Sequence, residues 1–528
     1  MSRTLTIYDV TLRDGAQGPG VKFSPEDQVR IVRALDRFGI TYIEGGQPGS
    51  NTKAVELFER AHDLELQHAK LVAFGSTRHP KHLPEDDKNL QQLLRAGTET
   101  VTIFAKSSPL HVSKVLRISL DKNLELIQDS IAYLKAHERK VFFDAEHFFD
   151  GYALDAEYAM TVLECALKAG ADVLVLCDTN GGRLPSEIGA ITRVVRERLP
   201  RADLGIHTHN DIGCAVAGTL AAVAEGATQV QGTINGYGER TGNADLSTLI
   251  PVIQLKLGIP LVSPDKLTTL TQLSRLVAEL ANMAPRDNAP FVGRHAFTHK
   301  GGMHADAVTK FKPSYEHVDP ALVGNVTRIP VSELSGRSSL MQKAAELGIS
   351  LDRDNPETRA LLDRVKELEK QGVEFEAADA SLDLLLRRAG GVSPTFFRVQ
   401  GFHVSVTRHG AHEPTFSVAS VNLAFPGGEK VHTSAEGDGP VDALNNALRK
   451  ALESEYPELR EVRLEDYKVR ILNAQAATQA TTRVLIESSD HNESWNTVGV
   501  SENIITASYE ALLDSIEFKL LRSRAAQT

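Results

Sequence analysis

The sequence predicts an α/β protein with an N-terminal (β/α)8 barrel, a helical linker and a C-terminal α+β domain. Short runs rich in valine and isoleucine alternate with longer amphipathic stretches eight times over about 255 residues, the size of a closed parallel barrel. Most runs also end in a polar side chain, as expected where the carboxyl ends of barrel strands form a functional rim. An open doubly wound sheet is the alternative, but no G-x-G-x-x-G phosphate loop follows the first run.

The eight expected strands share β-branched or aromatic residues bounded by turn residues. They are residues 5–9, 41–46, 70–75, 100–105, 141–146, 172–178, 204–209 and 228–235. Two of the stretches between them show clear helix ends. Ser24 and Pro25 are typical of an N-cap and a first helical position, and Asp155 and Gly170 bracket another helix.

The alternation stops near residue 260, and the remaining chain divides into two further parts. We expect a TIM-barrel domain over 1–260, helical linker subdomains over 261–394 and a C-terminal domain over 395–528. The last part contains a weak internal duplication, in which residues 431–448 align with residues 495–512. Each copy follows strand-like segments and opens a helix, so two βββα units would build this domain.

Composition narrows the class of protein. A chain of 528 residues with a net charge of −11 and no long basic run is not expected to bind nucleic acid or a membrane surface. The N-terminus lacks a signal-peptide pattern, and no apolar run approaches the roughly 20 residues of a membrane span. The three cysteines are scattered, which argues against a disulfide framework. A cytoplasmic enzyme is the expected class.

The stretch "GIHTHNDIG" predicts a metal site. His207 and His209 point to the same face of a strand, and Asp14, just after the first strand, can reach the same rim. Asn243, in the glycine-rich loop after the last strand, offers a fourth, neutral oxygen. A lone strand histidine is usually a core residue, but two in register with an acid on strand one favour a cation. The donors fit Mg²⁺, Mn²⁺, Co²⁺ or Zn²⁺, and the sequence does not choose among them.

A cation held there would polarise a substrate carbonyl, and neighbouring rim residues suggest how the substrate is held. Arg13, beside Asp14, is placed to add positive charge at the same oxygen. Glu146, at the end of the fifth strand, and Thr179, just past the sixth, are candidates to orient the substrate.

Four motifs closely resemble the family of 2-isopropylmalate, homocitrate and citramalate synthases. They are "YDVTLRDGAQ", "YIEGGQPGSN", "HTHNDIGCAVAGTLAAVAEGATQVQGTINGYGERTGNADL" and "AFTHKGGMHADAV", and the likeness covers nearly the whole chain. One departure is Val10, where the family usually has a second threonine. The resemblance implies a Claisen-type condensation, in which the enolate of acetyl-CoA attacks the keto carbon of a 2-oxo acid on the metal. Water then cleaves the thioester.

The resemblance also implies roles for individual residues. The metal positions of the family fall on Asp14, His207, His209 and Asn243, and its carbonyl-polarising arginine falls on Arg13. Substrate binding is assigned to Arg13, Gln17, Glu44, Glu146 and Thr179, and catalysis to Arg13, Glu146, His304 and Tyr315. His304 and Tyr315 match the groups at the acetyl-CoA end. His299 also flanks "KGGM" and is the alternative to His304 as the base.

Other stretches bear on the 2-oxo acid and on regulation. "IEGGQPGSN", "DTNGG" and residues 372–388 resemble the citramalate synthase branch, which uses pyruvate and feeds isoleucine synthesis, although Gln47 replaces a more usual aromatic residue. The C-terminal domain resembles the regulatory, dimer-forming domain of the family, which implies a homodimer with isoleucine as effector; a purely structural dimerisation domain is the alternative. Isopropylmalate or homocitrate synthesis, a hydroxymethylglutaryl-CoA-lyase-like reaction and a non-catalytic amino-acid sensor remain open as other functions.

Overall fold

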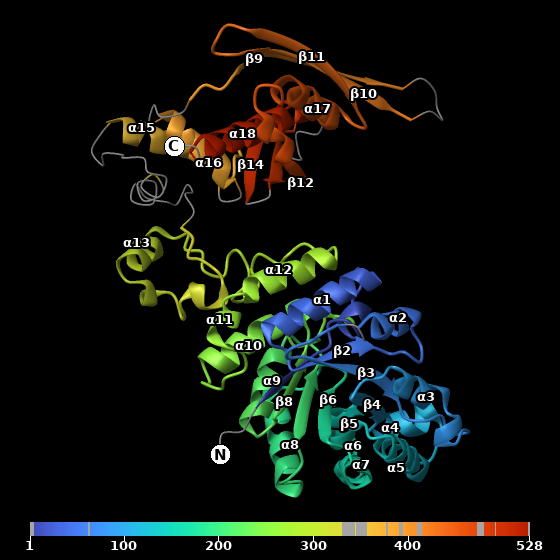
Figure 1. The fold of residues 1–528 in the computed structure, drawn as a ribbon. Helices are drawn as coiled ribbons and strands as arrows, with labels where there is room; N and C mark the ends of the chain where they lie inside the picture. The colour runs from blue at the N-terminus through green and yellow to red at the C-terminus, as the bar shows by residue number, and fades with distance from the viewer. Residues whose placement is uncertain are drawn as a thin grey trace. The chain divides into compact units, whose positions relative to one another are not determined.

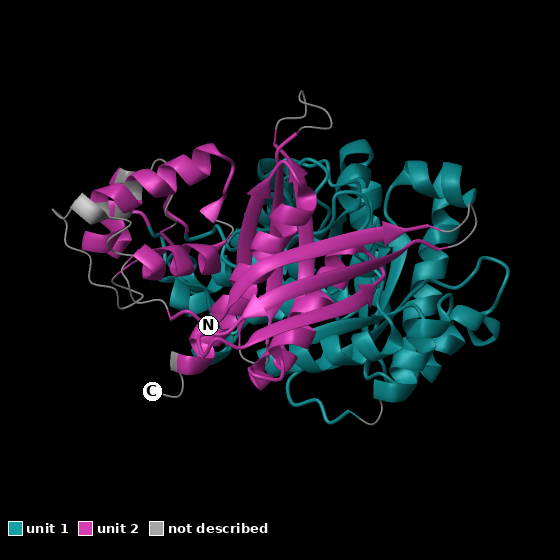
Figure 2. Cartoon of the chain, turned by 90° about the horizontal axis from the view of Figure 1, so that it is seen from above, with its two compact units in different colours: residues 1–297, 316–327 teal, residues 298–315, 328–528 magenta. Residues whose placement is uncertain are grey.

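The computed structural model describes residues 5–61, 64–329, 344, 356–375, 378–389, 394–408, 414–472, 480–490 and 493–525. The chain forms two compact units (Figure 2), one of residues 1–297 with 316–327 and one of residues 298–315 with 328–528. The division expected from the sequence, near residues 260 and 394, stays a prediction.

The first unit contains a closed barrel of eight parallel strands in chain order (Figure 1), which confirms the predicted fold. The strands are β1 (Thr6–Asp9), β2 (Tyr42–Gly46), β3 (Lys70–Ser76), β4 (Thr100–Lys106), β5 (Lys140–Glu146), β6 (Val173–Asp178), β7 (Leu204–Thr208) and β8 (Gln229–Gly232). Each overlaps one of the eight predicted runs. The first and last strands close the barrel, with Thr6 paired to Gln229 and Asp9 to Gly232.

Helices follow the strands around the barrel. They are α1 (Pro25–Phe38), α2 (Thr52–Ala61), α3 (Lys88–Arg95), α4 (Pro109–His111), α5 (Leu120–Ala136), α6 (Phe148–Leu154), α7 (Ala156–Ala169), α8 (Pro185–Arg198), α9 (Ala215–Ala224) and α10 (Leu246–Leu255), with α11 (Pro264–Leu267) and α12 (Leu270–Leu280) after them. The predicted helix ends are confirmed. The Ser24 side chain accepts a hydrogen bond from the Asp27 amide, and Gly170 ends α7 with a φ of 104°.

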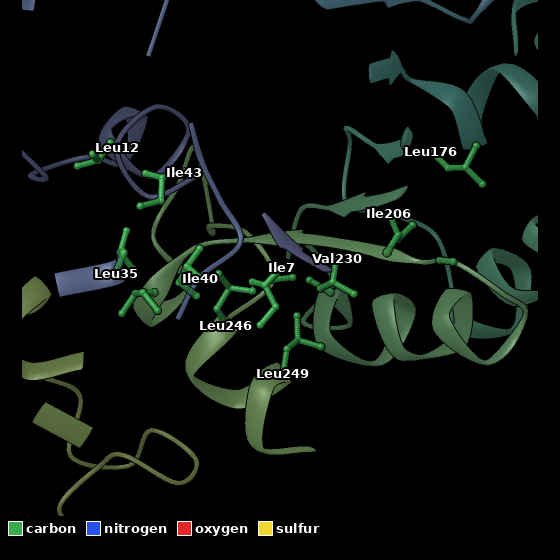
Figure 3. Packing of buried hydrophobic residues seen from close by; sticks show 14 of the residues in the cluster. Ile7, Leu12, Leu35, Ile40, Ile43, Leu176, Ile206, Val230, Leu246 and Leu249 are labelled. Carbon is green, nitrogen blue, oxygen red and sulfur yellow. The ribbon is translucent and has the colours of Figure 1, made fainter. Parts of the chain in front are cut away.

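Two apolar layers make the barrel rigid. Outside it, Ile7 and Val230 lie beside Leu246 and Leu249 of α10 (Figure 3), where burial contributes about 1.5–3 kcal/mol for each large side chain. A second buried cluster has the members Tyr8, Val10, Tyr42, Val72, Phe142, Val173, Val175 and Cys177. In barrels of this kind, the chemistry takes place at the carboxyl ends of the strands.

The second unit confirms the two predicted βββα repeats. One comprises β9 (Arg398–Thr407), β10 (Phe416–Ala424), β11 (Lys430–Gly437) and α17 (Pro440–Leu452), and the other β12 (Arg463–Ile471), β13 (Thr482–Ser489), β14 (Ser494–Ser501) and α18 (Ile504–Ala525). Before them come α13 (Gly302–Lys310), α15 (Pro356–Lys370) and α16 (Asp379–Ala389). Within the described ranges, no helix combines the length and the apolar character needed to cross a membrane.

Asp36 joins α1 to the segment that enters β3. Its carboxylate accepts hydrogen bonds from the backbone amides of Gln67, His68 and Ala69, at 3.1, 2.8 and 2.8 Å. Burial acts to raise the pKa of Asp36, but the three amide donors outweigh it and lower the pKa below its usual value. The ionised form therefore stabilises this corner of the barrel.

We expect Asp36→Asn to lower the free energy of unfolding by about 1–2 kcal/mol near pH 7, because its amide nitrogen would face backbone donors. Since the folded-state pKa is depressed, the stabilisation by Asp36 is present above the unfolded-state pKa of about 4 and is lost as the pH falls. Urea unfolding at several pH values measures this. A difference between variant and parent that does not shrink below about pH 4 would contradict the assignment.

Candidate active site

Asp14, His207 and His209 meet at the carboxyl ends of β1 and β7. The Nε2 atoms of the two histidines lie 3.3 Å apart, and Asp14 Oδ2 lies 3.4 Å from His207 Nε2 and 3.7 Å from His209 Nε2. All three side chains are buried, and among the described residues they form a group that could hold a metal ion. Donors bound to one ion at about 2.0–2.2 Å are themselves roughly 3–3.5 Å apart, so this spacing suits a single cation.

Asn243 lies against this group. It forms an isolated bridge with His209, and its Nδ2 donates to Asp14 Oδ1 at 3.1 Å and to the Tyr237 carbonyl at 3.2 Å. Its Oδ1 is buried and has no hydrogen-bond partner among the described residues. A buried acceptor without a partner is costly unless something else binds it, which fits a fourth, neutral ligand.

Two glycines let the loop after β8 carry Asn243 to this place. Gly238 and Gly242 have φ values of 153° and 97°, which side-chain-bearing residues rarely adopt. A Cβ at Gly242 would lie 1.9 Å from the Gly236 carbonyl oxygen, and one at Gly238 would lie 2.1 Å from Asn243 Nδ2. The backbone of this loop therefore requires glycine at both positions, which explains the glycine spacing seen in the sequence.

The charges of Asp14 and His209 suit cation binding. Burial acts to raise the pKa of Asp14, but Arg13 and the two histidines outweigh it and hold that pKa well below its usual range. Burial, together with the neighbouring His207, lowers the pKa of His209 to about 4. Asp14 is thus ionised and His209 neutral at pH 7, the forms in which both bind metal ions.

Arg13 is held rigidly beside Asp14. Its Nε donates to Glu44, its Nη1 donates to Asp14 Oδ2 at 3.1 Å, and its guanidinium carbon lies 3.9 Å from the centre of the Phe74 ring. Glu44 is fully buried, and its other oxygen accepts a hydrogen bond of 2.5 Å from Tyr8. The supporting roles of Tyr8 and Phe74 were not predicted from the sequence, although strand alternation points both side chains into the barrel.

The remaining predicted barrel residues lie at, or just past, the carboxyl ends of β1, β5 and β6. Glu146 forms an ion pair of 2.6 Å with Lys106, at the ends of β5 and β4. The Thr179 hydroxyl accepts a hydrogen bond of 2.8 Å from the backbone amide of His147. Gln17 is exposed, in the short helical turn Gly15–Gln17 directly after Asp14. Lys106 was missed because the predicted strand stopped one residue short of it.

His304 and Tyr315 form a pair within the second unit. Their rings stack with centroids 4.1 Å apart and an interplanar angle of 26°, and both side chains are exposed. The ring of His299 lies 6.4 Å from that of Tyr315. The closer contact favours His304 over His299 as the partner of this tyrosine.

Comparison with known proteins places these features in a family. Residues 4–277 match the HMGL-like family, residues 291–373 the homocitrate synthase post-HMGL domain-like family, and residues 376–520 the LeuA allosteric (dimerisation) domain. The chain is 52% identical to an (R)-citramalate synthase of Aquifex aeolicus over 99% of both chains. It is also 52% identical to one of Geobacter sulfurreducens over 98% of both. A 2-isopropylmalate synthase of Shouchella clausii is 30% identical over 99% of this chain and 98% of its own.

We expect Glu44→Gln to lower the free energy of unfolding by about 2–4 kcal/mol, because it leaves the buried Arg13 with one acidic partner instead of two. Glu56→Gln is the matched control: Glu56 pairs with Arg60 at 2.6 Å on the surface, where such a change costs less than about 1 kcal/mol. Urea unfolding followed by circular dichroism measures both. Equal losses in the two variants would contradict a special role for the buried pair.

Proposed function

The chain belongs to the family of the (R)-citramalate synthases, and we propose that it condenses acetyl-CoA with pyruvate to give citramalate and free CoA. The observation that supports this most strongly is the convergence of Asp14, His207 and His209 on one barrel rim. It occurs in a chain that resembles five relatives of that name at 43–52% identity over nearly its whole length. Pyruvate is favoured over 2-oxoisovalerate because the isopropylmalate synthase relative of Shouchella clausii is much less similar, at 30%.

The barrel residues are proposed to hold a divalent cation, with Mn²⁺, Mg²⁺, Zn²⁺ and Co²⁺ as candidates. Asp14, His207 and His209 would bind it, and the buried Oδ1 of Asn243 would be the fourth donor. When bound, such a cation acts as a Lewis acid toward a carbonyl group. A 2-oxo acid has a keto group on which such a Lewis acid can act.

The condensation proceeds by a proton transfer and one new carbon–carbon bond. A base takes a proton from the methyl group of acetyl-CoA, and the resulting electron pair attacks the keto carbon of pyruvate. The keto oxygen gains a proton as the bond forms, and water then splits the thioester into a carboxylate and the CoA thiol. We assign the base to His304, with Tyr315 stacked on it, because an imidazole transfers protons near neutral pH.

Arg13 is proposed to stabilise the developing negative charge on the keto oxygen. Its Nε donates to Glu44 and one Nη1 hydrogen to Asp14, so Nη2 and the second Nη1 hydrogen can donate to a substrate. Glu146, Thr179 and Gln17 stay the predicted contacts of the 2-oxo acid. Glu44 is also predicted to contact the 2-oxo acid, but its hydrogen bond with Arg13 favours a role in positioning that arginine.

A thiol-release assay with acetyl-CoA tests the reaction. We expect release with pyruvate to exceed release with 2-oxoisovalerate at least tenfold, to stop with a chelator and to return with Mn²⁺. Asp14→Ala should lower the rate at least 100-fold, since it removes the charged donor. Faster release with 2-oxoisovalerate would instead support an isopropylmalate synthase. Unchanged release with the chelator and with Asp14→Ala would overturn the metal assignment.

The C-terminal region is proposed to form a homodimer and to bind isoleucine. Residues 376–520, which match the LeuA allosteric (dimerisation) domain, contain both βββα repeats except the C-terminal end of α18. Isoleucine is the expected effector because citramalate leads toward that amino acid. The cytoplasm, where its metabolites are used, stays the expected location.

We expect isoleucine to lower the rate severalfold, and calorimetry to record its binding, while leucine has a smaller effect. Because coupling is reciprocal for binding, saturating pyruvate should weaken isoleucine binding by the same factor by which isoleucine weakens pyruvate binding. If isoleucine gives no heat of binding and does not inhibit the reaction, the C-terminal region is a purely structural dimerisation domain.

A further inference from the structure

His207 contacts the barrel interior as well as the candidate metal site. Its Nε2 faces Asp14 and His209, and its Nδ1 lies 2.9 Å from Oε1 of Gln231 on the neighbouring strand β8. An amide oxygen only accepts hydrogen bonds, so His207 must donate from Nδ1. A neutral imidazole that carries its proton on Nδ1 presents a lone pair on Nε2, the atom needed by a metal.

The orientation of the Gln231 amide is itself fixed by its surroundings. Gln231 is fully buried, and its Nε2 donates to Asp144 Oδ1 at 3.4 Å and to Gln229 Oε1 at 3.3 Å. If the amide were turned over, its oxygen would face these two acceptors and its nitrogen would face the His207 ring. The first change sets oxygen against oxygen, which is unfavourable in a buried site. The strand β8 therefore decides which nitrogen of His207 carries the proton.

We propose that Gln231 is a positioning residue, which holds His207 in the Nδ1–H tautomer and so prepares Nε2 for the cation. This inference rests on the proposed metal site. His209 provides an internal contrast, because its Nδ1 is buried without a hydrogen-bond partner among the described residues. Only one of the two imidazoles is thus oriented by an amide of the barrel interior. Such outer partners of metal-bound histidines change metal affinity by about 10–100-fold.

Three variants test the proposal. Gln231→Met keeps the length of the side chain but removes the acceptor, and Gln231→Glu keeps an acceptor while losing the donor to Asp144. Gln28→Met is the matched control, since Gln28 is a buried glutamine on α1. The measurement is Mn²⁺ affinity of the metal-free full-length protein, from the electron paramagnetic resonance signal of free Mn²⁺. Circular dichroism establishes that each variant is folded.

We expect Gln231→Met to bind Mn²⁺ about 10–100-fold more weakly, and Gln231→Glu and Gln28→Met to stay within about threefold of the parent or to bind more tightly. Unchanged affinity in Gln231→Met, or equal weakening in Gln231→Met and Gln231→Glu, would overturn the inference. If Gln231→Met does not fold, the ¹⁵N shifts of His207 in the parent decide, and a proton found on Nε2 with none on Nδ1 overturns it. A parent that binds no Mn²⁺, or binds it equally well as Asp14→Ala, would instead reject the metal site itself.

Discussion

Closure of the barrel between β1 and β8 is the constraint on which the candidate site depends. The pairing of Thr6 with Gln229 and of Asp9 with Gly232 brings the first turn of the chain beside the loop that carries Asn243. Asp14 and Asn243 are 229 positions apart in sequence, yet their side chains form a hydrogen bond of 3.1 Å. No local segment can supply this set of donors, so the site exists only in the closed barrel.

Closure of the barrel also brings several charged side chains together in its interior. Arg13 is the positively charged side chain of the site, and it forms ion pairs with the two acids Glu44 and Asp14. A third acid, Asp144, lies deeper, where burial and then repulsion by Glu44 raise its pKa to about 7. Arg13 can neutralise only one of the two acids that it faces, and Asp144 is partly ionised near pH 7. The excess negative charge in a place of low polarity favours a divalent cation beside Asp14, and it also explains why Arg13 is tied down on two sides.

The sequence predicted the parts of this arrangement that depend on periodicity. Alternating apolar runs gave the eight strands, and the two-residue spacing of His207 and His209 placed both on one face. The individual hydrogen bonds and ion pairs between neighbouring strands were not predictable, because they depend on the stagger of those strands in the closed barrel. The ion pair of Glu146 with Lys106 and the hydrogen bond of His207 with Gln231 both cross between adjacent strands. Neither has a pattern within one segment that reveals it.

The side-chain amides of Gln231 and Asn243 are oriented in the same way. In each, the nitrogen donates to two acceptors, which are Asp144 and Gln229 for Gln231, and Asp14 and the Tyr237 carbonyl for Asn243. The carbonyl oxygen is thereby turned the other way, toward His207 Nδ1 in one case and, in the other, without a partner in the part of the chain that the structure describes. Because a buried amide cannot turn over without setting oxygen against oxygen, both oxygens are fixed before any ligand arrives. An oxygen oriented in this way loses little conformational entropy when a ligand binds. Most of the entropic cost of ordering the site is therefore incurred when the barrel folds.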